Sequence, residues 1–234
     1  MKKIVFVVIK KRTFVLLSFF ALVTNLFAQE MSYGVHAGFN LSKVTGNEYQ
    51  VYDEKCRAGW QIGGDVKYTT KKIVQIGSGL EMKISKGQFA VMSNYISASG
   101  QPMTLFPMVK MTDISIGIPL YIGYKIDLAN AISLIPNVGF FASYSVASLN
   151  DDVQIHDDNG HDRIEQWKCY DGYSNGAWTI DPFRRFCFAP RIGLDVLISK
   201  HYILTIAFQK DVTELSHQYG CKRQSLNLNI GYSF

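Results

Sequence analysis

Residues 113–126 read Asp-Ile-Ser-Ile-Gly-Ile-Pro-Leu-Tyr-Ile-Gly-Tyr-Lys-Ile, and this stretch decides the fold class of the chain. Every even-numbered residue in it is apolar or aromatic, whereas most of the odd-numbered ones are Gly, Ser or charged. A period of two is typical of a β-strand with one apolar face, because successive side chains point to opposite sides. Soluble strands average about five or six residues, and a tilted strand needs about 9–11 to cross a bilayer. The stretch therefore has the length of a membrane-spanning strand.

The same alternation recurs between residues 32 and 234 and predicts eight strands, an even number. A second interpretation of the charge-free stretch Leu128–Asn150 is a transmembrane helix. Pro136 and Asn137 in its middle are costly in such a helix, so a strand is favoured. Besides residues 113–126, the predicted strands are Ser32–Leu41, Arg57–Tyr68, Ile73–Ser85, Ala131–Val146, Phe186–Ile198, Tyr202–Asp211 and Arg223–Phe234.

The connections between the strands separate the two folds that this alternation fits, a soluble β-sandwich and a membrane β-barrel. Tight turns and long loops follow each other in strict alternation, which is typical of outer-membrane barrels and has no reason to occur in a sandwich. We therefore predict an all-β protein, an eight-stranded antiparallel up-and-down transmembrane β-barrel. The turns are Thr69–Lys72, Asp127–Asn130 and Ser199–Lys200, and the loops are Ser42–Cys56, Gly87–Thr112, Ala147–Arg185 and Val212–Lys222.

Aromatic residues of the apolar faces are sorted by strand end. Two girdles of aromatic residues, one at each membrane interface, would produce this distribution, whereas ordinary core aromatics would not be sorted. Those near the turns are Tyr68, Tyr124, Tyr202 and Tyr232, and those toward the loops are Phe39, Trp60, Tyr144, Phe188 and Phe208.

Residues 1–28 are expected to be a cleaved secretory signal peptide. The basic region Lys2–Arg12 precedes the apolar run Thr13–Phe27, and the small residue Ala28 follows it. A single N-terminal membrane anchor is the alternative, and the short apolar core argues against it. Residues 29–234 then form the barrel domain, located in the cell outer membrane.

Charge and composition narrow the class of protein further. The formal net charge of +5 belongs to the first 28 residues, because the remainder holds 19 basic and 19 acidic residues. This balance gives no reason to expect a nucleic-acid partner. An aromatic content of 13% and a charged content of 18% exclude a disordered or fibrous chain.

Two short motifs resemble the PorT-like outer-membrane β-barrel family of the Bacteroidetes. The segment Gly34–Ser42 is similar to the first strand of that family, and Ile118–Lys125 is similar to its "IPL…YK" strand. The end, Asn229–Phe234, resembles the terminal aromatic signal of barrels that are inserted into an outer membrane. The resemblance implies an eight-stranded barrel in the outer membrane of a Gram-negative bacterium. It also implies a role related to protein secretion, and it carries over no catalytic residue.

Charged residues on the polar faces of the strands are predicted to line the interior of the barrel. Eight strands enclose only enough room for side chains, so opposite charges can meet there. We expect a salt-bridged plug, and an ion or proton path is the alternative. The predicted lumen network is Arg57, Asp65, Lys67, Glu81, Lys83, Lys125, Arg191 and Asp195.

Four cysteines fall in the long loops or at the strand ends beside them: Cys56, Cys169, Cys187 and Cys221. An even number of cysteines in an exported chain suggests disulfides. We favour a Cys169–Cys187 bond, which leaves Cys56 to pair with Cys221. A metal site is the alternative, but no Cys-x-x-Cys or clustered His spacing supports it.

The loop 147–185 is the candidate for contact with an extracellular protein or glycan. Trp167, Tyr170, Tyr173 and Trp178 would suit such a contact if exposed, or would pack on the loop itself. A Ca²⁺ site at His156–Asp162 is the weaker interpretation of an acidic turn, since alignment of Gly160 with the EF-hand glycine puts an isoleucine at the first ligand position.

We expect a non-enzymatic, monomeric barrel that contacts outer-membrane lipid, has no cofactor, and uses its loops for partner binding or envelope integrity. The alternative is an enzyme at the rim of the barrel that acts on lipid or peptide. His36 is predicted to face the lumen, and His156, His161 and His217 lie in loops. No spacing among them fixes a catalytic triad.

Overall fold

The computed structural model describes residues 31–46, 51–70, 73–96, 102–105, 107–149, 151–156, 162–174 and 179–234. The signal peptide predicted at residues 1–28 lies outside these ranges. The strands are β1 (Met31–Thr45), β2 (Val51–Thr70), β3 (Val74–Val91), β4 (Ser93–Ile96), β5 (Pro102–Leu105), β6 (Met108–Tyr124), β7 (Ile126–Ala129), β8 (Ile132–Ser148), β9 (Asp151–His156), β10 (Asp162–Trp167), β11 (Tyr173–Ser174), β12 (Thr179–Ile180), β13 (Phe186–Ile198), β14 (Tyr202–Lys210) and β15 (Lys222–Ser233).

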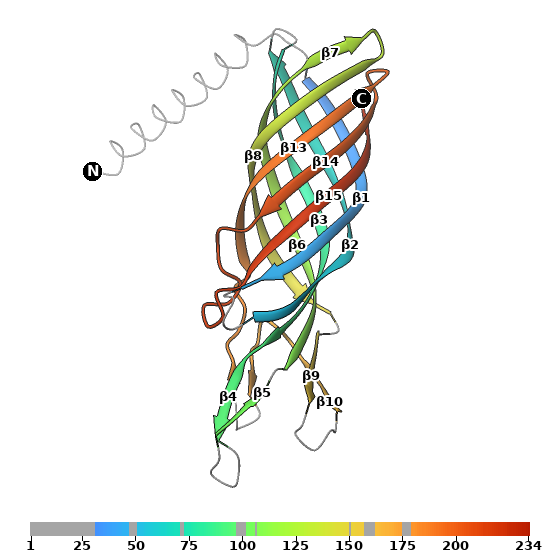
Figure 1. Cartoon of the computed structure of the whole chain (residues 1–234). Coiled ribbons are helices and arrows are strands. Elements are labelled where there is room, and N and C mark those ends of the chain that lie inside the picture. The colour runs from blue at the N-terminus through green and yellow to red at the C-terminus, as the bar shows by residue number, and fades with distance from the viewer. Residues whose placement is uncertain are drawn as a thin grey trace, which may run out of the picture.

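Eight of these strands close into a barrel, which confirms the predicted fold class (Figure 1). The order around the barrel is β1, β2, β3, β6, β8, β13, β14 and β15, and every neighbouring pair is antiparallel. Closure comes from pairing of the first strand with the last, with Gly34 opposite Ser233 and Thr45 opposite Lys222. A closed sheet leaves no edge, so its backbone donors and acceptors are satisfied within the wall. Strand β8 occupies the charge-free stretch that could have been a helix.

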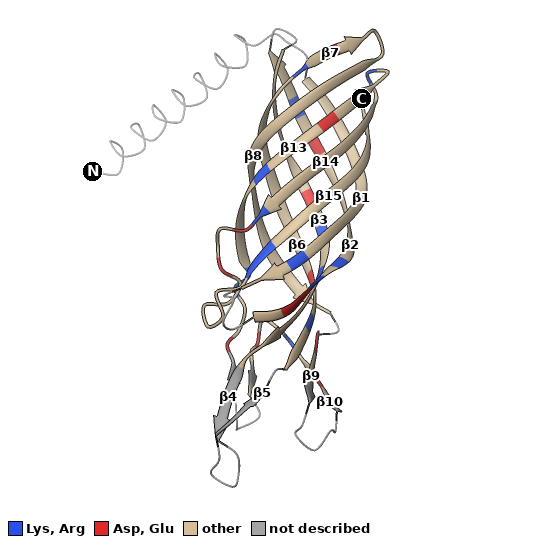
Figure 2. Ribbon diagram, in the orientation of Figure 1, with Lys and Arg blue, Asp and Glu red and all other residues tan. Residues whose placement is uncertain are grey.

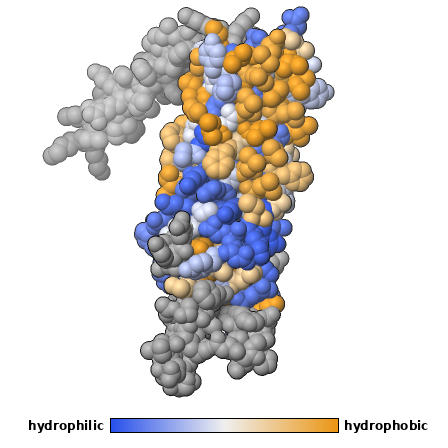
Figure 3. All heavy atoms as spheres, viewed as in Figure 1, coloured by the Kyte–Doolittle hydropathy of each residue, from blue (hydrophilic) through white to orange (hydrophobic). Residues whose placement is uncertain are grey.

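Side chains of the barrel strands alternate between the interior and the outer surface as predicted. In β6, buried Ser115 and Tyr121 alternate with exposed Ile116, Ile118 and Leu120. The outer surface is therefore an apolar band, and Figure 3 shows it over the part of the barrel nearest the short turns. The aromatic residues predicted at its two margins include exposed side chains at both ends: Tyr124, Tyr202 and Tyr232 near the turns, and Phe39, Trp60, Tyr144 and Phe208 toward the loops.

The wall continues beyond this band at the long-loop end, further than the alternation predicts. Strand β2 begins six residues before the predicted start at Arg57, and β3 ends six residues after Ser85. Strand β9 pairs with the extended start of β6, with Val153 opposite Val109. The hairpins β4–β5 and β9–β10 project from this end (Figure 1). No helix among the described residues is long and apolar enough to cross a membrane.

The short-turn end carries two unusual backbone conformations. Ser199 and Lys200, which connect β13 to β14, have φ angles of 52° and 64°. They are the two central residues of a β-turn in which the N–H of His201 donates to the carbonyl of Ile198 (3.2 Å), and positive φ at such positions is easier for Asn and Gly than for Ser and Lys. This turn therefore holds two residues in a conformation that their side chains disfavour.

Candidate functional site

The interior of the barrel is crossed by polar side chains from strands that are not neighbours in the wall. Figure 2 shows acidic and basic segments on strands all around the barrel. Three of these contacts join opposite sides of the lumen, because three strands separate the partners in the wall, and the contact of Gln61 with Asn229 bridges the single strand β1. From the turn end to the loop end they are Lys67–Asp195 (3.9 Å), Gln61–Asn229 (2.6 Å), Lys83–Gln209 (2.9 Å) and Arg223–Asp113 (2.7 Å).

The contact nearest the turns belongs to a mixed-charge group. The ammonium of Lys67 lies 3.6 Å from Asp65 and 3.9 Å from Asp195, and Thr205 donates to Asp195 at 2.8 Å. The imidazole of His36 lies 3.5 Å from Asp65. Since both signs are present within hydrogen-bonding or ion-pair reach, each buried charge has an opposite partner, as burial requires.

Aromatic rings complete the filling of the middle of the lumen. Arg191 lies over the ring of Tyr121 at 5.0 Å, and Lys83 lies over that of Phe141 at 4.8 Å, both within the range of cation–π attraction. Glu81 is buried and, with Arg191 and Tyr121, lines a cavity of only about 20 Å³. That volume is about one water molecule, so side chains rather than solvent occupy this level.

Two residues of the predicted lumen network lie at its margins. Lys125 sits at the turn end, 3.4 Å from the exposed Asp127. Arg57 lies at the loop end beside an irregular stretch of β2, where its Nη1 donates to Gln88 Oε1 at 3.4 Å. The structure thus brings Asp65, Lys67, Glu81, Lys83, Arg191 and Asp195 into the lumen.

The contact nearest the loops was not anticipated from the sequence. Arg223 of β15 donates to Asp113 of β6 across the barrel, and the hydroxyl of Tyr170 donates a short hydrogen bond to the other oxygen of the same carboxylate. Asp151 accepts hydrogen bonds from the backbone N–H groups of Thr112 (2.8 Å) and Cys169 (3.0 Å). The phase of the alternation does mark Arg223 and Asp113 as polar-face residues, but only the closed barrel sets them opposite each other.

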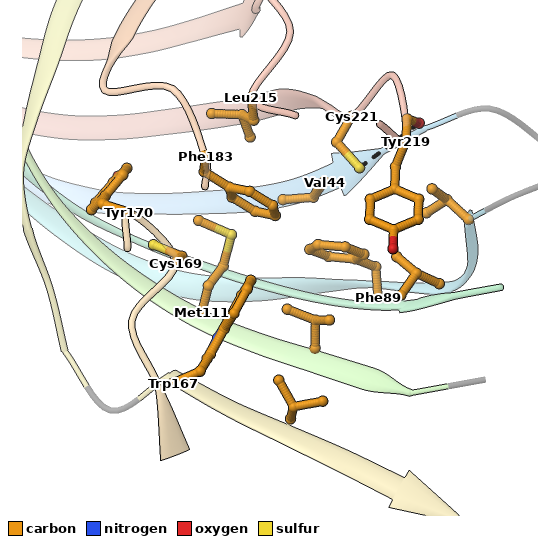
Figure 4. Close-up of a cluster of buried hydrophobic side chains, with 14 of the residues drawn as sticks. Val44, Phe89, Met111, Trp167, Cys169, Tyr170, Phe183, Leu215, Tyr219 and Cys221 are labelled. Atoms are coloured by element: carbon orange, nitrogen blue, oxygen red, sulfur yellow. Dashed lines mark hydrogen bonds between the residues drawn. The ribbon is translucent and has the colours of Figure 1, made fainter. Parts of the chain in front are cut away.

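An apolar core covers this polar layer at the loop end (Figure 4). Phe89 has no exposed surface and stacks on Phe183 with ring centroids 6.3 Å apart, while Trp167 meets the same ring edge-on at 5.6 Å. Fully buried Leu215 and Val153 add aliphatic surface from two further segments. The loops are therefore held down by a hydrophobic core of their own, as a small domain is.

The prediction of two disulfides is wrong for this structure, since Cys56, Cys169, Cys187 and Cys221 are all free thiols. Cys56 is exposed, whereas the other three are buried. Burial, with a contribution from Asp151, raises the pKa of Cys169, and burial raises the pKa of Cys221 to about 12. The buried thiols behave as small hydrophobic residues of the loop-end core, which stabilises the loops without a covalent link.

The aromatic residues of loop 147–185 divide between two outcomes. Trp167 and Tyr170 are buried in the loop-end core, so they pack within the protein and are not exposed for contact with a partner. The side chains of Tyr173 and Trp178, and most of the acidic turn His156–Asp162, lie outside the described residues. No group of three or more His, Cys, Asp or Glu side chains among the described residues could hold a metal ion.

A larger cavity of about 760 Å³ opens at the opposite end of the barrel, between the short turns. Lys67, Lys125 and Lys200 line it, together with Asp127 and Asp195. The cavity ends at the Lys67–Asp195 contact. The lumen is therefore wide at the turn end and filled by side chains between that contact and the loops.

The comparison with protein families agrees with this architecture. The model of the family described as outer membrane protein beta-barrel domain matches residues 27–188. The attachment invasion locus protein Ail of Yersinia pestis is 11% identical, with a TM-score of 0.40, covering 88% of this chain and 99% of that one. OprG of Pseudomonas aeruginosa is 12% identical (TM-score 0.41; coverage 88% and 97%). The protease OmpT of Escherichia coli is 11% identical (TM-score 0.48; coverage 87% and 96%). No curated protein matches the sequence.

Proposed function

Because the chain belongs to the outer membrane protein beta-barrel domain family, we propose that it is a closed scaffold that presents a folded platform outside the outer membrane. The protein is integral to that membrane, and its apolar band faces lipid. The platform comprises the loop-end core and the hairpins β4–β5 and β9–β10. We assign no catalytic role to it.

The observation that carries this proposal is the closure of the lumen beneath an ordered platform. Three side-chain contacts join opposite sides of the barrel and a fourth bridges β1, and the cavity that Lys67, Glu81 and Tyr121 line holds only about 20 Å³. A barrel that conducted solutes would need a continuous path instead. The wall is also extended beyond the lipid-facing band and capped by buried Phe89, Phe183 and Trp167, which supports a role for the loops as a rigid binding surface.

The partner that we propose is an extracellular protein or glycan that contacts the hairpins. The exposed Ile164 of β10 offers an apolar contact at this end. The test is binding of the purified protein in nanodiscs to a glycan array and to labelled surface proteins of the same cells. A variant whose hairpin 154–164 is replaced by a short Gly-Ser turn should lose the signal, while heat-modifiable migration of the barrel stays unchanged. Binding that survives this replacement would refute the assignment of the platform.

The resemblance to PorT-like barrels of the Bacteroidetes extends the proposal to a secretion-related role for the same platform. Deletion of the gene should then reduce a defined set of secreted proteins in the culture medium, and the hairpin variant should fail to restore them. Normal secretion in the deletion strain would limit the role to adhesion or envelope integrity.

The rim enzyme remains the second candidate because the loop end holds one acid–base pair. His217 Nδ1 lies 2.8 Å from Glu214 Oε2 on the exposed surface, and no described Ser, Thr or Cys side chain hydrogen-bonds to either residue. Lipid A profiling of the deletion strain tests this candidate, and a profile changed by His217→Ala would support it.

A further inference from the structure

Five lysines stand on the outer wall of the barrel where the apolar band ends at the loop side. Each lies in a strand and directly follows a buried residue, so its side chain leaves the wall outward. Lys43, for example, lies between Ser42 and Val44, which are both about 1% exposed. We define these five residues as the basic collar: Lys43, Lys86, Lys110, Lys210 and Lys222.

Three of the collar lysines directly follow the lipid-facing band, and Lys110 and Lys222 lie one outward position further from it, beyond Thr112 and Gln224. The last apolar residues that point outward are Leu41 in β1, Ile84 in β3 and Phe208 in β14, and a lysine follows each of them two residues later. Two residues of strand rise about 7 Å, which is the step from acyl chains to headgroups. Figure 3 shows the hydrophobic surface giving way to a hydrophilic belt at this level on the face in view.

Strand register places the collar residues side by side with neutral hydrogen-bond donors. Gln224 of β15 lies opposite Lys43 of β1 on one side and next to Lys210 of β14 on the other. Since strands are about 4.8 Å apart, the backbones of these two lysines stand about 10 Å apart with an amide between them. A similar arrangement occurs on β3 and β6, where Lys86 is opposite Thr112 and Lys110 is opposite Gln88.

Most of the positive charge of the collar is uncompensated. Lys43 pairs with Glu54 at 2.8 Å. Lys110 lies directly opposite Asp152 of β9 in the strand register. Lys86, Lys210 and Lys222 form no ion pair with another described residue. The exposed Arg184 lies further out, where its backbone N–H donates to the carbonyl of Leu215 in the loop that follows β14 (2.7 Å). Figure 2 shows basic segments at the loop ends of neighbouring strands.

We infer that the basic collar binds the phosphate groups of the glycolipid in the outer leaflet. Ammonium groups, amides and hydroxyls are all donors to a phosphate oxygen, and the collar offers these in one belt. Each lysine near an anionic headgroup layer contributes about 1 kcal/mol, an attraction that salt screens. The apolar band directly beneath would take the acyl chains of the same lipid, so a phosphorylated lipid fits where a free anion would bind more weakly.

The test is lipid binding by the full mature protein, measured by native mass spectrometry from neutral detergent. The probes are bisphosphorylated lipid A, chemically dephosphorylated lipid A and phosphatidylglycerol. Bisphosphorylated lipid A should bind most tightly, and its affinity should fall in the triple variant Lys86→Gln/Lys210→Gln/Lys222→Gln by about fivefold per lysine. The matched control, Lys125→Gln/Lys200→Gln at the opposite end, should bind as the unmodified protein does.

Three outcomes would overturn the inference. They are equal binding of dephosphorylated lipid A, equal binding of phosphatidylglycerol, and unchanged affinity in the triple variant. Heat-modifiable migration checks that each variant is folded, and if the triple variant does not fold, the single variants Lys210→Gln and Lys222→Gln should each show the fivefold loss. None of these results depends on whether the platform has an extracellular partner, so this inference and the proposed function can fail separately.

Discussion

Arg223 of β15 and Asp113 of β6 face each other across the barrel, with Nη1 of the arginine 2.7 Å from Oδ2 of the aspartate. Three strands separate β15 from β6 in the wall, so the contact joins opposite sides of the lumen. Asp113 has no exposed surface, and Tyr170 of the loop region donates to its second oxygen. The pair therefore does two things at once: it closes the barrel and attaches the loop-end core to the transmembrane wall.

Replacing only one member of this pair should be strongly destabilising. Arg223→Met leaves the carboxylate of Asp113 buried without its cation, which costs about 3–5 kcal/mol. Replacing both, in Asp113→Leu/Arg223→Met, should recover most of the loss, because a well-packed apolar pair often matches a buried ion pair. Urea unfolding of the protein in lipid vesicles, followed by tryptophan fluorescence, measures both changes.

Lys125→Gln is the matched control for the previous variant. Lys125 pairs with the exposed Asp127 at 3.4 Å, and a solvent-exposed pair of this kind contributes little to stability. A loss in Lys125→Gln as large as that in Arg223→Met would show that the unfolding assay does not distinguish the buried contact.

Phe89→Ala should loosen the platform without opening the barrel. Phe89 is fully buried and stacks on Phe183, so its truncation leaves a cavity that costs about 3–5 kcal/mol. We expect faster trypsin cleavage in the loops, while the barrel itself stays protease-resistant and heat-modifiable. Cleavage at the unmodified rate would mean that the loop-end core does not order the loops.

Thiol alkylation should distinguish the exposed cysteine from the three buried ones. At pH 8, one maleimide should add rapidly to Cys56, and Cys169, Cys187 and Cys221 should react only after unfolding. Burial holds the pKa of Cys221 near 12, so its thiolate is scarce at this pH. Mass spectrometry of the labelled protein counts the adducts. Detection of a disulfide-linked peptide, or of no label after unfolding, would contradict the free-thiol structure.

Asp211, just after β14, should make stability depend on pH. Burial raises the pKa of its carboxyl, and Arg223 and Lys83 only partly offset that effect. The folded state then binds more protons than the unfolded state between the two pKa values, so stability falls as pH rises through the raised pKa. Asp211→Asn removes this term. We expect the variant to gain stability relative to the unmodified protein as pH rises above about 4.

Urea midpoints of both proteins, measured at several pH values under identical lipid conditions, test this expectation. A constant difference between the two curves, or a difference that shrinks as pH rises, would exclude Asp211 as the titrating group.

Ser199→Asn/Lys200→Gly should stabilise the turn between β13 and β14. Both positions have positive φ, which Asn and Gly adopt with less strain, and we expect a gain of about 1 kcal/mol. The rate of unfolding in urea reports the gain. An unchanged or lowered stability would mean that the Lys200 side chain makes compensating contacts at the mouth of the turn-end cavity.

The fold was predictable because alternation is a local property of the chain. The phase of residues 113–126 fixes which side chains face lipid, and the turn at Ser199–Lys200 fixes the neighbour of β13. The extension of β2 and β3 beyond the lipid-facing band was not predicted. The outward residues there, such as Lys86 and Gln88, are polar, so apolar and polar residues no longer alternate along the strand.

The lumen was partly predictable, and the loop-end core was not. The alternation places Lys67, Asp195 and Arg223 on the polar face of their strands, which predicts that they point inward. Only closure of the barrel decides which of these residues meet across the lumen. The even number of cysteines suggested disulfides. The sequence alone does not distinguish an exported chain whose loops form their own apolar core from one whose loops need disulfide cross-links. Cys169 and Cys221 are buried by residues distant in sequence, such as Phe89, that no local pattern connects to them.

Single-channel recording of the purified protein in a planar bilayer tests the central claim, a closed lumen beneath a folded platform. We expect no stable open-channel current from the unmodified protein in neutral salt, because the Arg223–Asp113 contact near the loops and the Lys67–Asp195 contact at the inner limit of the turn-end cavity block the path. Arg223→Met should produce brief openings at most. A long-lived conductance level in the unmodified protein would contradict the account and would identify the barrel as a channel.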